Sequence, residues 1–308
     1  MKPGSLQIGS RGSPLALTQA RAVAAMLGLG EDAVQAFMTS GDRIQGRLQE
    51  AGGKGLFTKE LDEALLDGRI DCAVHSMKDL PTKLPPGIVL AAVPAREDPR
   101  DGFIALKAKA LADLPKGATV GTASLRRQAQ TLHLRPDLQV ELLRGRVETR
   151  LAKIESGQFD ATYLALAGLK RLGLAQHAAS IVDVETMPPA PAQGALAITA
   201  RAGDAATLAA LKVLDIEAFN IATAAERAFL AALDGSCRTP IAALARIAGG
   251  RLNFIGEVLT PDGKHRWRRD GDCAATMDAA MALGARLGAD VRAEAGPLYS
   301  AHFGDSGW

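Results

Sequence analysis

Short apolar runs alternate with amphipathic stretches along most of the chain. In the first part, the short apolar runs are residues 5–9, 33–38, 70–74 and 88–93. Runs of this length are typical of strands buried in a sheet. Between them, residues 15–27 and 56–66 have the composition and spacing of helices, and Phe57, Leu61, Ala64 and Leu65 fall on one face of the second. The alternation predicts a parallel sheet covered by helices.

The same pattern is repeated further along. The predicted strands are 118–121, 138–143 and 160–166, and helices are predicted to begin within 122–127 and at 147. Two proline-rich segments, 94–101 and 188–194, flank this second set, and residues 195–199 read as one more strand. The chain is therefore expected to leave a first α/β lobe, build a second, and return. Two doubly wound lobes joined by two hinge crossings resemble the architecture of periplasmic-type binding proteins.

The last part of the chain has a different pattern. Residues 222–233 predict a helix, 241–247 a strand, 252–267 a hairpin turning at Pro261-Asp-Gly263, and 274–289 a helix. We expect a small α+β domain over 217–308, after a discontinuous first domain (1–95 and 195–215) and a second domain (100–189).

Composition narrows the class of protein. With 36 Lys and Arg against 34 Asp and Glu, the net charge of +2 does not indicate a nucleic-acid partner, and aromatic residues at 4% offer few platforms for stacked bases. No apolar run reaches the length of a membrane span, and the N-terminus lacks the apolar core of a signal peptide. Three widely spaced cysteines predict neither a metal site nor a disulfide framework. We expect a reduced, cytoplasmic, multidomain protein without a membrane partner.

Basic residues recur where the predicted strands end. Arg11 follows the first strand, and Ser13 with Pro14 forms the start of a helix. The ends of the second-lobe strands carry Arg126, Arg127, Arg144, Arg146, Arg150, Lys170 and Arg171. In doubly wound sheets the ligand crevice lies at this edge, and the planar guanidinium suits carboxylates and phosphates. For Arg11 alone, an anion site and a solvated surface residue are equally expected. Any one of the second-lobe arginines is most often a surface residue, but together they favour a polyanionic ligand.

Three other segments are candidates for chemistry. Cys237 lies in Leu233-Asp-Gly-Ser-Cys-Arg-Thr-Pro-Ile241, a loop past a helix end, where Arg238 favours the thiolate; a lone loop cysteine is more often without function. Asp79 follows Lys78 in a strand-end loop, either as a solvated ion pair or as a carboxylate that stabilises positive charge. The polar segment 41–55, with five glycines and Lys54, is a lid candidate or a plain surface loop.

Several motifs together resemble the porphobilinogen deaminase family of tetrapyrrole biosynthesis. They are Lys54, His75-Ser-Met-Lys-Asp79, Gly121-Thr-Ala-Ser-Leu-Arg-Arg127, Leu143-Arg-Gly145, Ala167-Gly-Leu-Lys-Arg-Leu-Gly173 and the Cys237 loop. The resemblance runs in order from about Ile8 to that loop and continues weakly to the end. It implies a monomeric three-domain transferase that condenses porphobilinogen units on a covalent dipyrromethane cofactor and releases hydroxymethylbilane.

The resemblance also assigns roles to residues. It implies that Cys237 holds the cofactor through a thioether and that Asp79 is catalytic, stabilising cationic intermediates as ammonia leaves. Residues implied in cofactor binding are Ser76, Lys78, Thr122, Ser124, Arg126, Arg127, Arg144 and Gly145. Residues implied in binding porphobilinogen and the growing chain are Arg11, Ser13, Arg144, Arg150, Gly168, Arg171 and Gln193. Lys54 and Phe57 are implied in the lid, and no metal is required.

Four positions depart from the family pattern: Glu50, Arg146, Ala192 and Ser236. Ala192 stands where glycine is common, before Gln193-Gly194, and is expected to stiffen the second crossing. The alternative to an enzyme is a two-lobed anion-binding protein without catalysis. Such binders usually carry an export signal, and the sequence does not begin with one.

Overall fold

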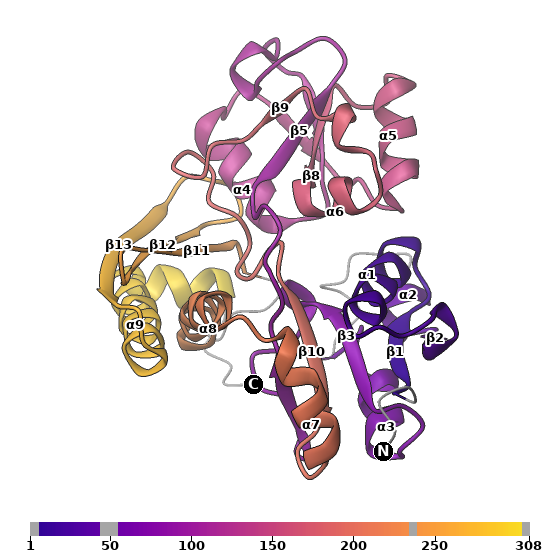
Figure 1. Cartoon of the computed structure of the whole chain (residues 1–308). Coiled ribbons are helices and arrows are strands. Elements are labelled where there is room, and N and C mark those ends of the chain that lie inside the picture. The colour runs from indigo at the N-terminus through magenta and orange to yellow at the C-terminus, as the bar shows by residue number, and fades with distance from the viewer. Residues whose placement is uncertain (1–5, 44–54, 234–238, 304–308) are drawn as a thin grey trace. The chain divides into compact units, whose positions relative to one another are not determined.

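The computed structural model describes residues 6–43, 55–233 and 239–303, and Figure 1 shows its elements. The chain divides into two compact units. The first is Met1–Glu97 with Gly194–Asn220, and the second is Asp98–Gln193 with Ile221–Trp308. The first unit begins and ends within a few residues of the predicted first lobe. The second contains both the predicted second lobe and the C-terminal α+β region, so the division into three domains stays a prediction.

The first unit is built on a five-stranded sheet of order β2-β1-β3-β10-β4. Its strands are β1 (Ile8–Arg11), β2 (Val34–Phe37), β3 (Cys72–Ser76), β4 (Ile88–Ala92) and β10 (Leu196–Arg201). Its helices are α1 (Pro14–Met26), α2 (Ser40–Arg43), α3 (Lys59–Leu66) and α7 (Ala205–Leu211), with 3₁₀ turns at Glu31–Ala33, Met77–Asp79 and Lys212–Leu214. Strand β1 is parallel to β2 and β3, whereas β10 is antiparallel to both β3 and β4.

Helix α1 shows how the local sequence defines an element. Ser13 caps it by accepting a hydrogen bond from the Ala16 N–H at 3.3 Å, and Pro14 occupies the first turn, where no amide donor is needed. Gly28, at φ 68°, ends it, because only glycine adopts this backbone without strain. Between these ends, the buried face of α1 packs on β1 and β3 with Val23 and Ala24.

The second unit begins with a sheet of order β7-β6-β8-β5-β9. Its strands are β5 (Asp101–Ala105), β6 (Thr119–Gly121), β7 (Gln139–Glu141), β8 (Ala161–Ala165) and β9 (Ser180–Ile181). Its helices are α4 (Leu125–Leu134), α5 (Val147–Glu155) and α6 (Leu166–Arg171), with 3₁₀ turns at Leu111–Asp113 and Ala175–His177. Strand β6 is parallel to β7 and β8, whereas β5 is antiparallel to β8 and β9.

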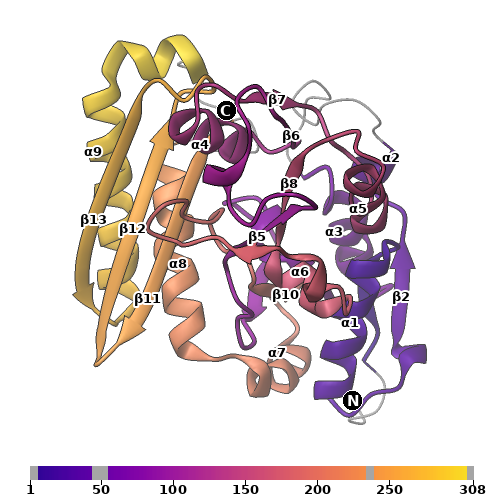
Figure 2. The ribbon, with the colours of Figure 1, turned by 90° about the horizontal axis from the view of Figure 1, so that it is seen from above.

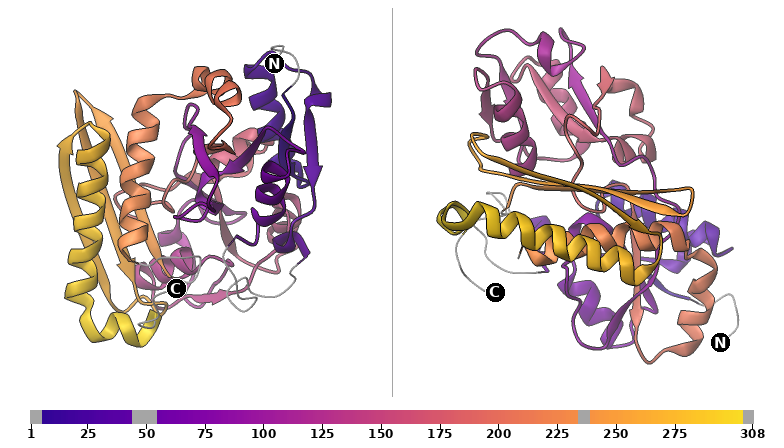
Figure 3. Two further views of the ribbon diagram at one scale, coloured as in Figure 1. Left: turned by 90° about the horizontal axis from the view of Figure 1, so that it is seen from below. Right: turned by 90° about the vertical axis from the view of Figure 1, so that its left-hand side faces the viewer.

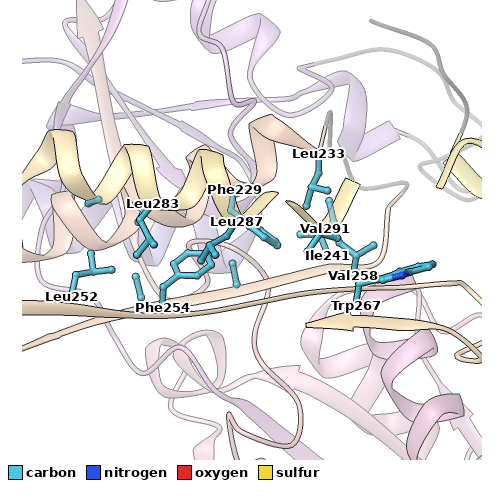
Figure 4. Packing of buried hydrophobic residues seen from close by; sticks show 14 of the residues in the cluster. Phe229, Leu233, Ile241, Leu252, Phe254, Val258, Trp267, Leu283, Leu287 and Val291 are labelled. Atoms are coloured by element: carbon cyan, nitrogen blue, oxygen red, sulfur yellow. The ribbon is translucent and has the colours of Figure 1, made fainter. Parts of the chain in front are cut away.

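The same unit ends in a three-stranded antiparallel sheet whose strands lie side by side in Figure 2. They are β11 (Ile241–Ala248), β12 (Arg251–Leu259) and β13 (Arg266–Ala274). Helices α8 (Glu217–Ala232) and α9 (Met277–Phe303) share one core with this sheet, and Figure 3 shows α9 along one face. Figure 4 shows Phe229, Phe254 and Leu287 in that core. Within the described part of the chain, no helix is long and apolar enough to cross a membrane.

The predicted fold class is confirmed: two α/β lobes and an α+β region with a hairpin. Details of the two lobes differ from the prediction. Each lobe has a mixed sheet, because β10 and β5 run against their neighbours. Strand β5 was not predicted, since its first residue closes a charged, proline-rich segment. The polar segment 41–55 begins inside helix α2, and residues 44–54 lie outside the described residues.

Candidate active site

The first unit gathers its polar residues at one edge of the sheet. Strands β1, β2 and β3 are parallel and in register, with Ile8 opposite both Val34 and Cys72. Their C-terminal ends therefore meet. Arg11 is the last residue of β1, and Thr39 and Asp79 lie in the segments that follow β2 and β3. Strand β10 enters from the same edge, since Leu196 pairs with Ser76. An edge of this kind is where α/β sheets bind ligands.

Arg11 is held in a fixed orientation by two neighbours. Its guanidinium forms an ion pair with Asp42 and lies over the Phe57 ring, 4.1 Å from the centroid. The Thr39 hydroxyl donates to the same carboxylate at 2.7 Å. Burial alone would raise the pKa of Asp42, but the hydrogen bonds from Arg11 and Thr39 outweigh burial and hold the pKa below its usual value. Phe57, expected in the lid, is thus a support for Arg11.

Asp79 ends a 3₁₀ turn (Met77–Asp79) that follows β3 directly. Two backbone hydrogen bonds anchor the turn. The Met77 N–H donates to the Ala195 carbonyl at 3.0 Å, and the Leu80 N–H donates to the Met77 carbonyl at 3.0 Å. Asp79 is half-buried, and Lys78 beside it is exposed. A carboxylate on an anchored turn is in place to stabilise positive charge on a bound molecule.

Ser76 and His75 fix the strand that leads to Asp79. The Ser76 Oγ lies 3.0 Å from Nε2 and 3.1 Å from Oε1 of Gln19, on α1. His75 is buried, and its Nε2 lies 3.1 Å from the Thr199 hydroxyl. Burial, and then the nearby charge of Arg11, lowers the pKa of His75 to about 4, so this imidazole is neutral at pH 7.

The second unit repeats this arrangement. Strands β6, β7 and β8 are parallel, so the segments after Gly121, Glu141 and Ala165 leave from one edge. Strand β5 is antiparallel, and its first residue, Asp101, pairs with Ala165 at the same edge. The reversal of one strand therefore brings a carboxylate among the arginines.

Asp101 joins two of the predicted cofactor ligands. Its fully buried carboxylate accepts from Arg126 Nη2 at 2.8 Å and from Arg127 Nη2 at 2.7 Å. Arg127 also donates from Nη1 to the Tyr163 carbonyl at 2.9 Å. Burial alone would raise the pKa of Asp101, but the two guanidiniums outweigh it and hold the pKa far below its usual value. Both arginines are 7% exposed or less, so most of their N–H donors face the interior of the protein.

Arg144 and Arg150 give this edge an excess of positive charge. Arg150 donates from Nε to the Gly145 carbonyl at 2.8 Å. Burial, together with the charges of Arg127 and Arg144, lowers the pKa of Arg150 to about 10. The buried Arg144 Nη1 has no hydrogen-bond partner among the described residues. A buried guanidinium whose affinity for protons is lowered by its cationic neighbours, together with a buried N–H donor that lacks a partner on one of those neighbours, favours the binding of an anion.

The start of α4 adds neutral donors and acceptors. Ser124 caps the helix by accepting from the Arg127 N–H at 3.4 Å, and the Ser124 N–H donates to the Thr122 hydroxyl at 3.1 Å. A helix N-terminus carries partial positive charge and favours an anion. Gly168 and Arg171 lie in α6, the helix that follows β8, and both are half-buried.

Gln193, which the resemblance implies in substrate binding, lies near the end of the second proline-rich crossing, residues 188–194. Its side chain is buried, and Nε2 donates to the Pro99 carbonyl and to Asp101, each at 2.8 Å. The Nε2 donors are thus engaged by the protein, and the residue ties the second crossing to the first.

The structure therefore places the predicted residues in two groups, each described within its own unit. The first-unit edge carries Arg11, Ser13, Ser76, Lys78 and Asp79. The second-unit edge carries Thr122, Ser124, Arg126, Arg127, Arg144, Gly145, Arg150, Gly168 and Arg171. Lys54 and Cys237 lie outside the described residues, as do Glu50 and Ser236. In the described ranges, no group of three or more His, Cys, Asp or Glu side chains could hold a metal ion.

The sequence pattern did not reveal the carboxylates that orient the arginines. Asp42 lies in the polar segment read as a lid, and Asp101 in the segment read only as a crossing. A usable signal was present near Asp101, since the apolar residues 103–105 begin two positions after it and mark a short strand.

Fold and site together define a two-lobed α/β protein with an arginine-rich anion site at one sheet edge and an anchored carboxylate at another. Comparison with known proteins gives the family. The sequence profile "Porphobilinogen deaminase, dipyromethane cofactor binding domain" matches residues 6–209, and the profile of the family's C-terminal domain matches residues 221–293. The chain belongs to the porphobilinogen deaminase family and contains its cofactor-binding domain.

Individual proteins agree with the profiles. A porphobilinogen deaminase of Caulobacter sp. (strain K31) is 56% identical, covering 95% of this chain and 96% of that protein. One of Phenylobacterium zucineum (strain HLK1) is 52% identical, covering 94% and 97%. Among solved structures, the methionine-binding protein MetQ matches 68% of this chain and 89% of its own with 13% identity and a TM-score of 0.42.

Proposed function

We propose that this chain condenses four porphobilinogen units, head to tail, onto an enzyme-bound dipyrromethane primer, releases ammonia at each step, and hydrolyses the product to free linear hydroxymethylbilane. Membership of the porphobilinogen deaminase family carries this proposal. The structural support is the excess of cations at the second-unit edge, because each pyrrole unit brings two carboxylates.

The residues at that edge fit a dipyrromethane. Arg144 has a buried donor without a partner in the described chain, and Arg150 is crowded by like charges, so carboxylates would relieve both. We propose that the cofactor's carboxylates are held by the residues Ser76, Lys78, Thr122, Ser124, Arg126, Arg127, Arg144 and Gly145, and that Cys237 carries the thioether. When bound, the group supplies the free pyrrole position at which chain growth begins.

Asp79 is the proposed catalytic residue. As porphobilinogen loses ammonia, positive charge spreads over its ring, and a carboxylate facing the pyrrole nitrogen stabilises that charge. The carboxylate sits on an anchored turn, so it need not reorganise as the charge develops. The cations at the strand ends bind carboxylates and cannot take this role.

The substrate's own carboxylates are assigned to the remaining cations. We propose that Arg11, Ser13, Arg144, Arg150, Gly168 and Arg171 bind the acetate and propionate groups of the incoming unit and of the growing chain. Arg11 is prepared for this by Asp42 and Phe57, which fix its orientation. Gln193 contributes through Asp101, because its Nε2 already donates to that carboxylate.

The test is the intact mass of the purified protein beside its Cys237→Ser variant. We expect the wild-type protein to be heavier by two linked pyrrole units and the variant to have the bare mass. Asp79→Ala should keep the added mass and lower kcat by about 10²- to 10³-fold, the size of effect seen when one charge-stabilising group is removed.

A bare wild-type protein that gains no mass from porphobilinogen would favour the alternative of a two-lobed anion-binding protein without catalysis. Normal turnover by Asp79→Ala would contradict the role given to that carboxylate. We also propose, from the resemblance, that the enzyme acts in the cytoplasm as a monomer without nucleic-acid or membrane partners. Light scattering at working concentration tests the monomer.

A further inference from the structure

Glu257 is a carboxylate in the buried part of strand β12, where it is only 1% exposed. Successive residues of a strand point to opposite faces of the sheet. Leu252, Phe254 and Val258 belong to the core shared with α8 and α9, so Glu257 lies on the other face of β12. A charged group is thereby placed in the interior of the second unit, where it needs hydrogen-bond partners.

Two side chains supply these partners. Arg266 on β13 donates from Nε to Oε2 of Glu257 at 2.8 Å. Gln130 on α4 donates from Nε2 to Oε1 of Glu257 at 2.6 Å and to the Pro188 carbonyl at 3.0 Å. A carboxylate and a carbonyl can only accept, so both must face the NH₂ group of the Gln130 amide. The amide oxygen of Gln130 is therefore turned the other way.

That oxygen faces Arg126. It accepts from Arg126 Nη1 at 2.8 Å, and the same Nη1 donates to the Pro188 carbonyl at 3.1 Å. Nη2 donates to Asp101 at 2.8 Å. The third nitrogen of the guanidinium, Nε, is buried and has no hydrogen-bond partner among the described residues. Because the guanidinium is planar and rigid, the bonds at Nη1 and Nη2 fix the direction of the Nε–H.

Negative charge reaches Arg126 from two strands. Burial lowers the pKa of Arg126, and the charges of Asp101 and, more weakly, Glu257 act against this lowering. Asp101 is shared with Arg127, so one carboxylate on β5 serves two guanidiniums. Glu257 adds a second carboxylate to this network, from β12.

Helix α4 has two further contacts with the hairpin formed by β12 and β13. Gln128 Nε2 donates to the Pro261 carbonyl at 3.2 Å, and Nδ1 of His133 lies 2.9 Å from the Gly263 carbonyl oxygen. All three contacts hold the helix against the hairpin. Of the three, the contact through Gln130 continues to Arg126.

We propose that Glu257 is a positioning residue for Arg126: through Gln130 it sets the direction of the buried Nε–H, the donor that Arg126 has left for a carboxylate of the dipyrromethane. The proposal rests on the proposed function in taking Arg126 as one of the residues that hold the cofactor. Because Glu257 acts through Gln130, it need not contact the cofactor itself.

Three variants separate this link from the general packing of the hairpin on α4. Glu257→Leu removes the acceptor, and the Arg266 side chain, 25% exposed, can then turn to water. Glu257→Gln keeps one oxygen for Gln130 and gives up the ion pair. Gln128→Met is the matched control, because it removes a hydrogen bond between the same helix and hairpin that does not lead to Arg126.

Protein prepared without the adduct is incubated with porphobilinogen at a range of concentrations, well below the Tm of each variant, and the added mass is followed in time. We expect Glu257→Leu to need about fivefold more porphobilinogen than wild type for half its maximal loading rate, the factor that corresponds to one neutral hydrogen bond. The maximal rate should stay the same, because Arg126 binds a carboxylate and not the reacting atoms. Glu257→Gln and Gln128→Met should both need the wild-type concentration.

The Nε–H signal of Arg126 in a proton–nitrogen NMR spectrum gives a second readout that does not depend on the cofactor. The signal is assigned by its absence from the spectrum of Arg126→Lys. We expect it to shift, and its proton to exchange faster with water, in Glu257→Leu but not in Gln128→Met. If Glu257→Leu does not fold, Gln130→Met removes the same link from the side of α4 and should give the same two results.

A wild-type half-saturating concentration or an unshifted Arg126 signal in the variant that breaks the link would overturn the proposal. An equal rise in Gln128→Met, or no recovery in Glu257→Gln, would overturn it as well. A wild-type protein that never gains mass would instead contradict the proposed function. The Arg126 signal would then decide the positioning alone: a shift in Glu257→Leu supports it, and an unchanged signal rejects it.

Discussion

At the residue scale, one carboxylate decides how the second-unit arginines lie. The Asp101 carboxylate accepts four hydrogen bonds, with donor–acceptor distances between 2.7 and 3.2 Å. The donors are Nη2 of Arg126, Nε and Nη2 of Arg127, and Nε2 of Gln193. Ion pairs buried this deeply add little net stability, but breaking one by removing a single partner leaves charge uncompensated in a medium of low polarity. The ion pairs therefore add little to the net stability of the fold, but the two arginines need Asp101 to compensate their buried charge.

Asp101→Asn tests this dependence. The amide keeps the shape of the side chain but removes the negative charge and places an NH₂ group against cationic donors. We expect the free energy of unfolding to fall by about 3–5 kcal/mol, measured by urea denaturation at pH 7. Asp137→Asn is the control, because the Arg135–Asp137 pair is more exposed and its loss should move the midpoint far less. An equal loss of unfolding free energy in the two variants would show that breaking the buried Asp101 ion pairs costs no more than breaking an exposed one.

Asp62 is expected to make the folded protein less stable as pH rises, and this direction can be tested. Burial, and then the charge of Glu63, raises the pKa of Asp62 to about 6, and its Oδ1 has no partner among the described residues. Between the unfolded value near 4 and the folded value, the folded state binds more protons. Stability contributed by this group is therefore present at low pH and is lost as pH rises through 6.

Asp62→Asn should accordingly be more stable than wild type at pH 8, by on the order of 1 kcal/mol after allowance for solvent screening. The difference should close as pH falls towards 4. The neutral His75 is present in both proteins, so its own titration cancels in the comparison. Thermal denaturation across this range measures the gap, and Asp67→Asn, exposed at the end of the same helix, should show no such trend. A constant gap at every pH would contradict the assignment.

The sequence predicted the basic half of the site better than the acidic half. Arginines at strand ends stand out because the strand pattern locates the edge of the sheet. Asp42 and Asp101 do not, since a carboxylate in a charged segment is most often solvated. What buries Asp101 is the reversed direction of β5, and strand direction is a property of the whole sheet.

At the element scale, the contact between α8 and α9 depends on a missing side chain. A Cβ at Gly284 would collide with the Ala225 carbonyl oxygen of α8 and would approach the Phe229 N at 3.1 Å. The obstacle is backbone, which cannot rotate away as a side chain would. The close approach of these two helices is therefore encoded by glycine in the middle of α9.

Gly284→Ala sets helix propensity against packing. Alanine favours a helix over glycine by about 1 kcal/mol, but here the helices must separate and loosen the core around Phe229. We expect a net loss of about 1–3 kcal/mol in the free energy of unfolding, measured by urea denaturation. Ala285→Ser, on the exposed side, should stay within about 0.5 kcal/mol of wild type. A stabilised Gly284→Ala would show that the helices are further apart.

The periodic elements were the ones that sequence could predict. The hairpin at Pro261-Asp-Gly263 is confirmed, with Gly263 at φ 73° between β12 and β13. Helix α9 was predicted to end near residue 289 but continues to Phe303. The glycines at 284, 288 and 296 weaken a helical pattern, and only the neighbouring helix explains the first two.

At the scale of the whole molecule, the two crossings, residues 94–101 and 188–194, are joined by hydrogen bonds within each unit. The Glu97 N–H donates to the Gly194 carbonyl at 3.3 Å, and Gln193 Nε2 donates to the Pro99 carbonyl. The proline-rich composition of 94–101 and 188–194 predicted two passages of the chain. It could not predict their pairing, because hydrogen bonds between segments almost a hundred residues apart have no local signature.

Ala192 shows how the second crossing is held. It is the one non-glycine residue with positive φ, 60°, in the part of the chain that the structure describes. That conformation is disfavoured for alanine by about 1–2 kcal/mol. Its N–H donates to Oε2 of Glu226 at 2.5 Å, and Oε1 of the same fully buried carboxylate accepts from the Ala245 N–H on β11 at 2.7 Å. Glu226 on α8 thereby ties the crossing to the C-terminal sheet.

Glu226→Gln should release that tie. A glutamine has one acceptor oxygen, so its NH₂ group would face one of the two backbone donors and leave a buried N–H without a partner. We expect a loss of about 2–3 kcal/mol in the free energy of unfolding and faster hydrogen exchange at Ala192, whose conformation would lose its main restraint. Glu217→Gln, exposed in the first turn of the same helix, should change neither. Slow exchange at Ala192 in Glu226→Gln would mean that the packing of the crossing, rather than this carboxylate, maintains the left-handed residue.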